Sequence, residues 1–334
     1  MNKIKAVFYD IKDYDKKFFR KYGKDYDIEM KFLKEKLNEE TVDLTKGYDV
    51  VCAFTNDDIN ENVVNGMADN GIKLLAMRCA GFNNVDLKSI NNRFKVARVP
   101  AYSPYAIAEY TVGMILSLNR KIHKAYVRTR EGNFSISGLI GFDLHEKTVG
   151  IIGAGKIAQI LIKILKGFGT KVIAYDPYPN AKVAEELGFE FVDLDTLYAN
   201  SDIISLNCPL TKETKYMINR DSMNKMKDGV MIVNTGRGML IDSIDLIEGL
   251  KDKKIGSAAL DVYEEEAEYF FKDMSTKVIE DDILGRLLSF HNVLITSHQA
   301  YFTQEAVEAI TKTTLNNIKD FAEGKELINE VPQK

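Results

Sequence analysis

The sequence predicts an α/β protein with two doubly wound parallel sheets, and three observations lead to this prediction. The chain has 334 residues, which suits two domains rather than one. Short apolar runs alternate with longer helical patterns from end to end, as expected for βαβ units. A second alternating series begins at Lys147. Since crossover connections between parallel strands are right-handed, each series should form its own doubly wound sheet.

The first series contains four apolar runs that we predict to be buried strands. They are Lys5–Tyr9, Tyr48–Phe54, Ile72–Met77 and Lys95–Val99. The stretch from Asn60 to Asn70 has a helical pattern between two of them. These residues therefore predict the sheet of the first domain.

A long helix is expected after Pro100. Ser103-Pro104 is typical of a helix start, with serine as the cap and proline in the first turn. The pattern predicts one helix from Pro104 to Tyr126, with an apolar side that includes Ile107, Met114 and Leu118. This helix either links two domains or packs against a second subunit.

The second series contains six predicted strands, as many as a complete dinucleotide-binding domain requires. They are Thr148–Ile152, Lys171–Asp176, Asp202–Asn207, Gly229–Asn234, Ile255–Leu260 and Asn292–Thr296. A final helix, Gln304–Gly324, is expected to return to the first domain. We therefore predict a discontinuous domain, 1–100 with 300–334, into which 101–299 is inserted.

Composition and charge exclude several classes of protein. The formal net charge is −4 and basic residues alternate with acidic ones, which argues against nucleic-acid or anionic-membrane binding. No run approaches the ~20 apolar residues of a membrane span, and the first apolar run is too short for a signal peptide. Cys52, Cys79 and Cys208 are far apart, without disulfide or zinc spacing, so we expect a reduced cytoplasmic setting and no metal.

A glycine motif follows the first strand of the second series and opens a helix. Gly153-Ala154-Gly155-Lys156-Ile157-Ala158 fits the G-x-G-x-x-[GA] dinucleotide fingerprint. Gly153 permits a tight turn, and Gly155 lets the backbone approach a pyrophosphate at the helix N-terminus. Asp176 ends the next strand, where a carboxylate accepts hydrogen bonds from the adenosine ribose. It would repel a 2′-phosphate, so the sequence predicts a Rossmann domain that prefers NAD to NADP.

Three polar side chains follow consecutive predicted strands. Arg237 follows Gly229–Asn234, Glu266 follows Ile255–Leu260, and His298 follows Asn292–Thr296. Ligands bind at the carboxyl ends of strands in open α/β sheets. Each residue alone fits an ordinary ion-paired or solvated role, but the trio favours a catalytic site. The remaining histidines, His123, His145 and His291, fit structural roles.

Five segments resemble the D-isomer-specific 2-hydroxyacid dehydrogenase family, and the resemblance covers essentially the whole chain. They are Arg78–Asp86, Val99–Pro104, Asn234–Gly238, Leu260–Glu266 and Thr296–Ala300. The resemblance implies a flavodoxin-like substrate domain around the inserted Rossmann domain. It also implies NADH-dependent reduction of a small 2-keto acid to a D-2-hydroxy acid, with pyruvate as the leading substrate.

The resemblance also implies roles for individual residues. Arg237 would clamp the substrate carboxylate with its guanidinium fork, and His298 would exchange a proton with the substrate oxygen while Glu266 orients the imidazole. The further substrate contacts it implies are Ala80, Gly81, Tyr102 and Tyr301. The further cofactor contacts it implies are Lys156, Ile157, Cys208, Pro209, Thr214, Thr235, Gly236 and Asp261.

Two positions depart from the pattern of the family. Gly236 stands where many relatives carry serine, and Ala158 replaces the third glycine of the fingerprint. Neither change removes a chemical group. The resemblance further implies a homodimer or a dimer-based tetramer.

Three alternatives differ in chemistry. The substrate could be a bulkier 2-keto acid, because pocket volume is not readable from sequence. The fold could serve an NAD-sensing binding protein, since a fold does not fix a function. Zinc-dependent alcohol dehydrogenase chemistry would need a Cys and His cluster at ligand spacing, which the sequence lacks.

Overall fold

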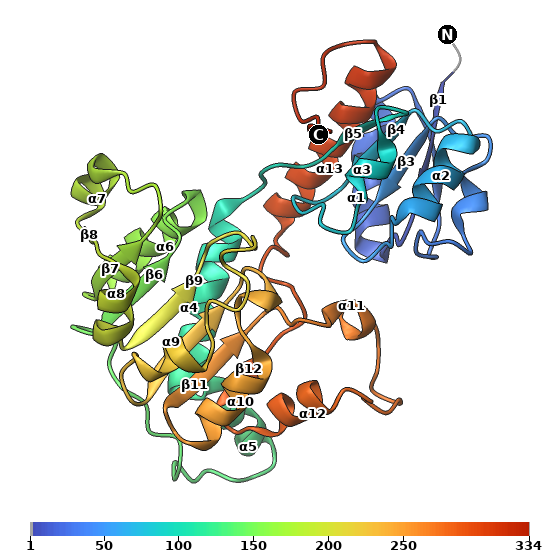
Figure 1. The fold of residues 1–334 in the computed structure, drawn as a ribbon. Helices are drawn as coiled ribbons and strands as arrows, with labels where there is room; N and C mark the ends of the chain where they lie inside the picture. Colours follow the sequence, from blue (N-terminus) through green and yellow to red (C-terminus); the bar gives the residue numbers. More distant parts are fainter. Residues whose placement is uncertain (1–2, 334) are drawn as a thin grey trace. The chain divides into compact units, whose positions relative to one another are not determined.

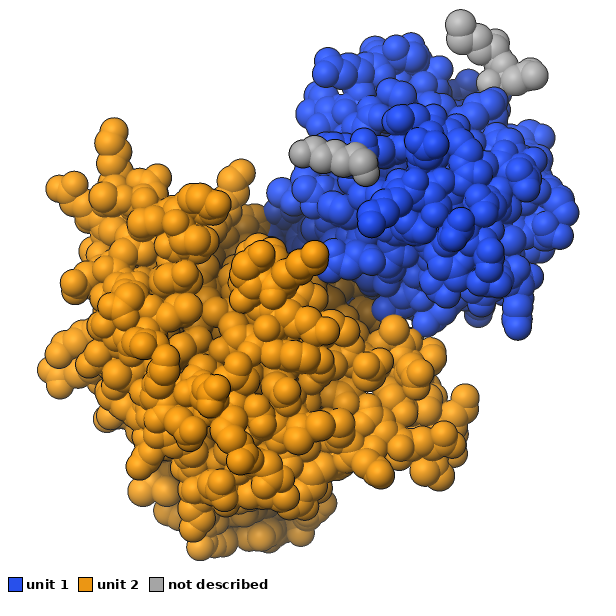
Figure 2. Space-filling view, viewed as in Figure 1, with its two compact units in different colours: residues 1–103, 302–334 blue, residues 104–301 orange. Residues whose placement is uncertain are grey.

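Each half of the chain forms its own parallel sheet with helices around it (Figure 1). The computed structural model describes residues 3–333. The chain divides into unit 1, residues 3–103 and 302–333, and unit 2, residues 104–301 (Figure 2). Within residues 3–333, no helix combines the length and apolarity that a bilayer-spanning segment requires.

Unit 1 contains a five-stranded sheet in the order β2-β1-β3-β4-β5, which is the flavodoxin-like order. All its strand pairs are parallel. The strands are β1 (Ile4–Phe8), β2 (Ile28–Phe32), β3 (Val50–Ala53), β4 (Leu74–Met77) and β5 (Lys95–Ala97). Four match predicted strands. The edge strand β2 was not predicted, because exposed Glu29 and Lys31 interrupt the continuous apolar run that marked the others.

The helices of unit 1 include the last helix of the chain. They are α1 (Asp13–Tyr22), α2 (Glu61–Asp69), α3 (Leu87–Ile90) and α13 (Gln304–Ala322), with 3-10 turns η1 (Gly23–Asp25) and η2 (Val42–Thr45). Leu315 and Ile318 of α13 share a buried cluster with Phe19 of α1 and Phe8 of β1. Burying this apolar surface attaches the C-terminal segment to the sheet formed by the N-terminal residues.

Unit 2 contains a seven-stranded parallel sheet in the order β12-β11-β10-β9-β6-β7-β8. The strands are β6 (Thr148–Ile152), β7 (Lys171–Tyr175), β8 (Glu190–Phe191), β9 (Ile203–Leu206), β10 (Val230–Asn234), β11 (Ile255–Leu260) and β12 (Val293–Ile295). Six match the predicted strands, and β8 is a two-residue addition at one edge. The direction of winding reverses between β6 and β9, where doubly wound sheets bind their ligands.

Helices cover both faces of this sheet. They are α4 (Pro104–Arg120), α5 (Ile122–Arg130), α6 (Lys156–Gly167), α7 (Ala181–Leu187), α8 (Leu194–Asn200), α9 (Arg220–Asn224), α10 (Ser243–Lys251), α11 (Glu266–Tyr269) and α12 (Asp282–Ser289), with the 3-10 turn η3 (Gly238–Leu240). Side chains alternate along β10: Met231 and Val233 pack in one buried cluster with α4 and α6, and Ile232 packs in the other.

The prediction of a single helix from Pro104 to Tyr126 is wrong. The structure has two helices, α4 and α5, because Lys121 between them adopts a left-handed conformation with φ of 50°. Asn119 exchanges hydrogen bonds with the backbone of Phe142, and Lys121 Nζ donates to Ile140 O at 2.5 Å. These contacts with a segment that follows α5 favour the break, and they are too remote in sequence for helical periodicity to show.

A buried arginine lies at the centre of unit 1. Arg78 is 1% exposed; its Nη2 donates to Asp10 O at 2.7 Å, and its Nε lies 3.7 Å from Asp15 Oδ2. Asp57 is also buried and accepts hydrogen bonds from the amides of Leu37 and Phe54. Burial raises the pKa of Asp57 to about 6, even though the charge of Arg78 opposes this. The guanidinium is thus the cation that compensates these buried carboxyl groups.

Replacing Arg78 should therefore destabilise unit 1. We expect Arg78→Met to lower the free energy of unfolding by about 3–5 kcal/mol, because it leaves buried carboxylates without a cation. Urea unfolding measured at neutral pH checks this. Arg20→Met, at an exposed position of α1, is the matched control and should change the free energy by no more than about 0.5 kcal/mol. Equal effects of the two substitutions would contradict the role of Arg78.

Candidate active site

The predicted catalytic residues follow three strands that are neighbours in the sheet of unit 2. Arg237 follows β10, Glu266 begins α11 after β11, and His298 follows β12. Because parallel strands place their carboxyl ends at one edge, all three residues emerge at the same edge of the sheet.

His298 and Glu266 form a direct pair. His298 Nδ1 lies 2.7 Å from Glu266 Oε1, and each side chain is 21% exposed. Facing a carboxylate, Nδ1 carries the hydrogen, so Nε2 is left to exchange a proton with a ligand. The other oxygen of Glu266 accepts a hydrogen bond from the Tyr263 amide at 3.2 Å. The carboxylate is thereby held in place and fixes the orientation of the imidazole.

The structure distinguishes Glu266 from the two acids before it. Glu264 accepts hydrogen bonds from Tyr216 Oη at 2.6 Å and from the Ser243 amide at 2.9 Å, which engages both of its oxygens. The hydrogen bond to Glu264 raises the pKa of Tyr216 to about 12. Glu265 is exposed. Of the acidic run, it is therefore Glu266 that contacts the imidazole.

A buried carboxylate holds the loop that carries His298. Asp261 is 0% exposed, and its oxygens accept hydrogen bonds from Thr296 Oγ1 at 2.6 Å, the Gln299 amide at 2.9 Å and the Ala300 amide at 2.8 Å. The His298 amide donates to Asp261 O at 2.7 Å. His298 has a positive φ of 52°, which is unfavourable for a residue with a Cβ. This network is the local reason that the strained conformation persists.

Asp261 is expected among the cofactor contacts, and in the structure its carboxylate also holds the loop that carries His298. It is fully buried, and its hydrogen-bond donors come from residues 296–300, after β12. Burial raises the pKa of Asp261, although these donors and the charge of His298 oppose that rise. Sequence spacing marked the residue but could not show which partners it meets.

Arg237 lies on a loop closed by Asn234. Asn234 Oδ1 accepts from the Gly236 amide at 3.0 Å, and Asn234 Nδ2 donates to Arg237 O at 2.8 Å. Arg237 Nη1 donates to Gly236 O at 2.8 Å. Since a guanidinium has five N–H donors, the fork retains donors for a ligand. The role of Asn234 in holding this loop was not predicted. Its position at the end of a strand, directly before the loop, is the sequence feature that could have indicated this role.

The glycine motif takes the geometry that a dinucleotide site needs. Gly153 has a φ of +90°, and a Cβ there would lie 2.8 Å from Asn207 C and from Cys208 N. Gly155 is the N-cap of α6, and a Cβ there would meet nothing within 4 Å. The chain itself therefore does not exclude a side chain at Gly155. Open space beside the free amides of a helix N-terminus fits the approach of a pyrophosphate.

Asp176 reaches this turn from the end of β7. Its Oδ2 accepts from the Ala154 amide at 2.8 Å, and its Oδ1 accepts from the Tyr178 amide at 2.8 Å. An ionised carboxylate has about four acceptor sites, so it can still accept from ribose hydroxyls. Ala158 is 1% exposed and packs in the core between α6 and the sheet, where a small residue is required. These residues fit a bound dinucleotide.

The other expected cofactor contacts lie on the same edge of unit 2. Lys156 and Ile157 open α6, and Thr235 Oγ1 is paired at 3.0 Å with Thr111 Oγ1 of α4. Cys208 and Pro209 follow β9, and Thr214 Oγ1 donates to Pro209 O at 2.7 Å. Burial raises the pKa of the Cys208 thiol to about 11. This thiol is therefore protonated at neutral pH and packs as a small apolar group.

The expected substrate contacts are divided between the two units. Ala80, Gly81 and Tyr102 belong to unit 1, and Tyr301 is the last residue of unit 2. Arg98 Nη1 donates to Ala80 O at 2.7 Å, and its guanidinium lies 5.1 Å from the centre of the Phe82 ring. Sequence reasoning missed both Arg98 and Phe271, whose ring centre lies 6.2 Å from that of His298.

Comparison with known proteins identifies the family. Residues 112–300 match the model of the D-isomer specific 2-hydroxyacid dehydrogenase NAD-binding domain. The chain is 49% identical to the D-lactate dehydrogenase of Escherichia coli over 98% of this chain and 100% of that protein. The apo structure of D-lactate dehydrogenase from E. coli has a TM-score of 0.90, at 47% identity, and covers 98% of this chain and 100% of its own.

A structure titled as identifying the pyruvate reductase of Chlamydomonas reinhardtii has a TM-score of 0.91, at 41% identity, over 98% of this chain and 99% of its own. The chain therefore belongs to the D-isomer-specific 2-hydroxyacid dehydrogenase family. It is an NAD-dependent oxidoreductase with two parallel-sheet domains, one of them a Rossmann domain.

The two glycines beside Arg237 should respond differently to substitution. A Cβ at Gly236 would meet its nearest atoms at 3.4 Å and beyond, which is ordinary contact. A Cβ at Gly238 would overlap the backbone of Tyr263 and Glu264. We expect Gly236→Ser to change stability by no more than about 0.5 kcal/mol. We expect Gly238→Ala to cost about 1–3 kcal/mol.

Thermal unfolding with and without NADH measures both substitutions. Gly236→Ser serves as the control for Gly238→Ala, because it adds a side chain two residues away on the same loop. A destabilisation of Gly236→Ser equal to that of Gly238→Ala would contradict the loop geometry described above.

Proposed function

We propose that this chain catalyses the reversible reduction of pyruvate to D-lactate with NADH. The observation that carries the proposal is the His298–Glu266 pair, 2.7 Å apart, on the strand edge that also carries Arg237 and the glycine turn. The similarity to proteins named D-lactate dehydrogenase and pyruvate reductase supports pyruvate as the substrate.

Each residue has one chemical role in the proposed reaction. Arg237 holds the substrate carboxylate in a bidentate clamp, and the amides of Ala80 and Gly81 donate to the same carboxylate. His298 Nε2 gives its proton to the ketone oxygen during reduction and takes it back during oxidation, while Glu266 stabilises the imidazolium. Bound NADH supplies the hydride that C2 of the substrate receives. Tyr102 and Tyr301 are the other substrate contacts of this proposal.

The proposed cofactor site uses the carboxyl edge of unit 2. The amides at the start of α6, from Lys156 and Ile157, meet the pyrophosphate, and Asp176 accepts from the ribose. Cys208, Pro209, Thr214, Thr235, Gly236 and Asp261 are the further cofactor contacts of this proposal. Asp261 also positions the loop that carries His298. In this proposal 101–299 binds NAD, and 1–100 with 300–334 binds the substrate.

We also propose a homodimer or a dimer-based tetramer. Ile122, Tyr126 and Val127 of α5 are 50–60% exposed, and Phe134, Ile136 and Ile140 of the following segment are 77–85% exposed. Arg128 Nη1 donates to Ser137 O at 2.8 Å, so this segment folds back on α5. An apolar face of this extent is typical of a surface that another chain covers. A cytoplasmic location is supported by three free cysteines.

One prediction of this proposal concerns catalysis. NADH absorbance at 340 nm should fall when pyruvate is added, and NADPH should react more slowly because Asp176 repels a 2′-phosphate. We expect His298→Ala to lower kcat by about 10²–10⁴-fold while NADH still binds. We expect Glu266→Gln to lower it by a smaller factor, with Glu265→Gln as the neutral control.

Two outcomes would redirect this proposal. Faster turnover of branched-chain or aromatic 2-keto acids than of pyruvate would favour the bulkier substrate. NADH binding without turnover of any 2-keto acid would favour an NAD-sensing protein. Chiral analysis of the product tests the D configuration.

The second prediction concerns assembly. Ile136→Glu combined with Phe134→Glu should shift the protein towards a monomer in sedimentation velocity, because two charges would be buried in the interface. Ile328→Glu is the matched control, since Ile328 is 88% exposed in unit 1. A wild-type protein that is monomeric at micromolar concentration would contradict the proposed dimer.

The third prediction concerns Arg98. Its charge-assisted hydrogen bond to Ala80 O polarises the peptide whose N–H belongs to Gly81, so that this N–H becomes a stronger donor. Arg98→Met should raise the KM for pyruvate by about tenfold, the equivalent of ~1.4 kcal/mol, with little change in kcat. Arg98→Lys should recover part of the loss. A change in kcat alone would contradict this positioning role.

A further inference from the structure

A second cavity in unit 2 lies at the opposite edge of the sheet from the candidate active site. It has a volume of about 870 Å³. Its floor is formed where β10, β11 and β12 begin, at Gly229, Ile255 and Asn292. The junction between α4 and α5 also lines it, together with residues 140–142 and α12; Ile140 belongs as well to the apolar face proposed above to contact a second chain. This size is within the range of small-molecule sites.

The charged residues that line this cavity are all basic or histidine. They are Lys121, His123, Lys251, Lys253, Arg286 and His291, and neither aspartate nor glutamate lines it. Glu248, just outside, pairs with Lys251 at 2.7 Å. Among residues 3–333, Lys253 and Arg286 form no ion pair within 4 Å. A concave surface lined by charges of one sign concentrates counter-ions.

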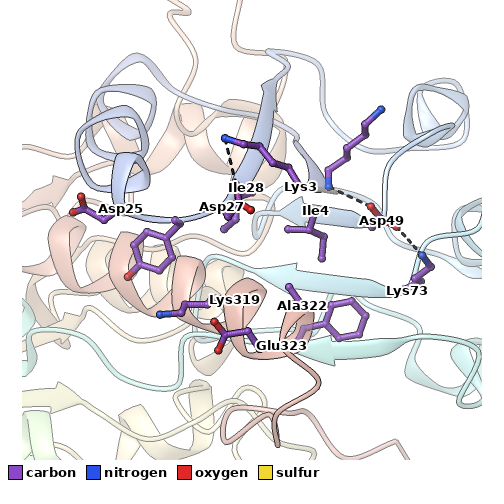
Figure 3. A pocket seen from close by; sticks show the side chains of 13 residues that line it. Lys3, Ile4, Asp25, Asp27, Ile28, Asp49, Lys73, Lys319, Ala322 and Glu323 are labelled. Carbon is purple, nitrogen blue, oxygen red and sulfur yellow. Dashed lines mark hydrogen bonds and ion pairs between the residues drawn. The ribbon is translucent and has the colours of Figure 1, made fainter. Parts of the chain in front are cut away.

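A cavity of similar size in unit 1 shows that this charge pattern is not general (Figure 3). Its volume is about 950 Å³, and four lysines and four acidic residues line it. Lys73 lies 2.7 Å from Asp49, and Lys3 lies 3.3 Å from Asp27. The charges of that cavity are balanced within the chain, whereas those of the cavity in unit 2 are not.

Two polar atoms of the basic cavity are buried without a hydrogen-bond partner in the described chain. They are His123 Nδ1 and Asn292 Oδ1. Leaving such a group unsatisfied is unfavourable. Both residues line the cavity, and both atoms can accept a hydrogen bond from a hydroxyl group of a ligand.

The lining also suits the carbon skeleton of a ligand. Leu118, Phe142 and Phe290 contribute apolar surface. The guanidinium of Arg286 lies 4.6 Å from the centre of the Phe290 ring, so the aromatic face holds it beside the cavity. A guanidinium fork matches the oxygens of a carboxylate or a phosphate.

We propose that this cavity is a binding site for a small polyvalent anion, a di- or tricarboxylate or a phosphate compound. Lys253 and Arg286 contact its charged groups. The site is separate from the dinucleotide site, because it lies at the amino ends of the strands whose carboxyl ends carry Arg237, Glu266 and His298. The anion and NADH therefore bind at the same time.

Isothermal titration calorimetry tests this proposal on the full chain in its native assembly. Inorganic pyrophosphate and propane-1,2,3-tricarboxylate are each titrated at low salt into the protein, with and without saturating NADH. NADH occupies the pyrophosphate-binding turn at Gly155 and removes binding there. We expect one anion per chain with NADH present, and an affinity at least tenfold lower in the Lys253→Glu, Arg286→Glu double variant.

The matched control is the Lys163→Glu, Lys182→Glu double variant. Both lysines are exposed in unit 2 and outside the cavity, and the net charge changes by the same amount. This control should retain wild-type anion affinity, and both double variants should retain NADH binding as a sign of intact folding. Which of the two anions binds more tightly distinguishes a phosphate site from a carboxylate site.

Two results would overturn the proposal. One is the absence of binding of either anion to the NADH-saturated wild-type protein. The other is an equal loss of affinity in the two double variants, which would reflect net charge alone. Neither result bears on turnover of 2-keto acids, so the proposed function is tested independently of the anion site.

Discussion

The hydrogen bonds accepted by Asp261 hold the loop that carries His298. A buried carboxylate is costly unless its oxygens are satisfied, and here three donors from residues 296–300 satisfy them. The same bonds hold His298 at a positive φ and present its imidazole to Glu266. The loop that carries His298 is therefore stabilised by a residue that does not contact the substrate in our proposal.

The parallel sheet of unit 2 supplies the second constraint. Parallel strands place their carboxyl ends at one edge, so residues 61 positions apart in sequence, such as Arg237 and His298, emerge together. The same geometry places the amino ends of these strands at the other edge, where basic side chains line a cavity. One sheet thus separates the proposed redox site from the proposed anion site.

Charge compensation differs between buried and exposed parts of the chain. Arg78 in unit 1 is buried beside several carboxyl groups, so its positive charge compensates their negative charges. Within residues 3–333, Lys253 and Arg286 have no such partner, and Arg237 keeps most of its donors free. Basic residues therefore stabilise the fold where carboxylates lie beside them, and they are free to bind ligands where none do.

The alternation of strands and helices, the glycine turn with Asp176, and the strand-end positions of Arg237, Glu266 and His298 followed from the sequence, because they depend on local periodicity and short motifs. Only the tertiary structure decided the break at Lys121, the addition of β2 and β8, the burial of Asp261 and the contact of Arg98 with Ala80. Each of these depends on partners distant in sequence: Asn119 meets Phe142, Asp261 meets the loop at 296–300, and Arg98 meets Ala80. Local patterns carry no information on such pairings, since packing fixes them only when the chain has folded.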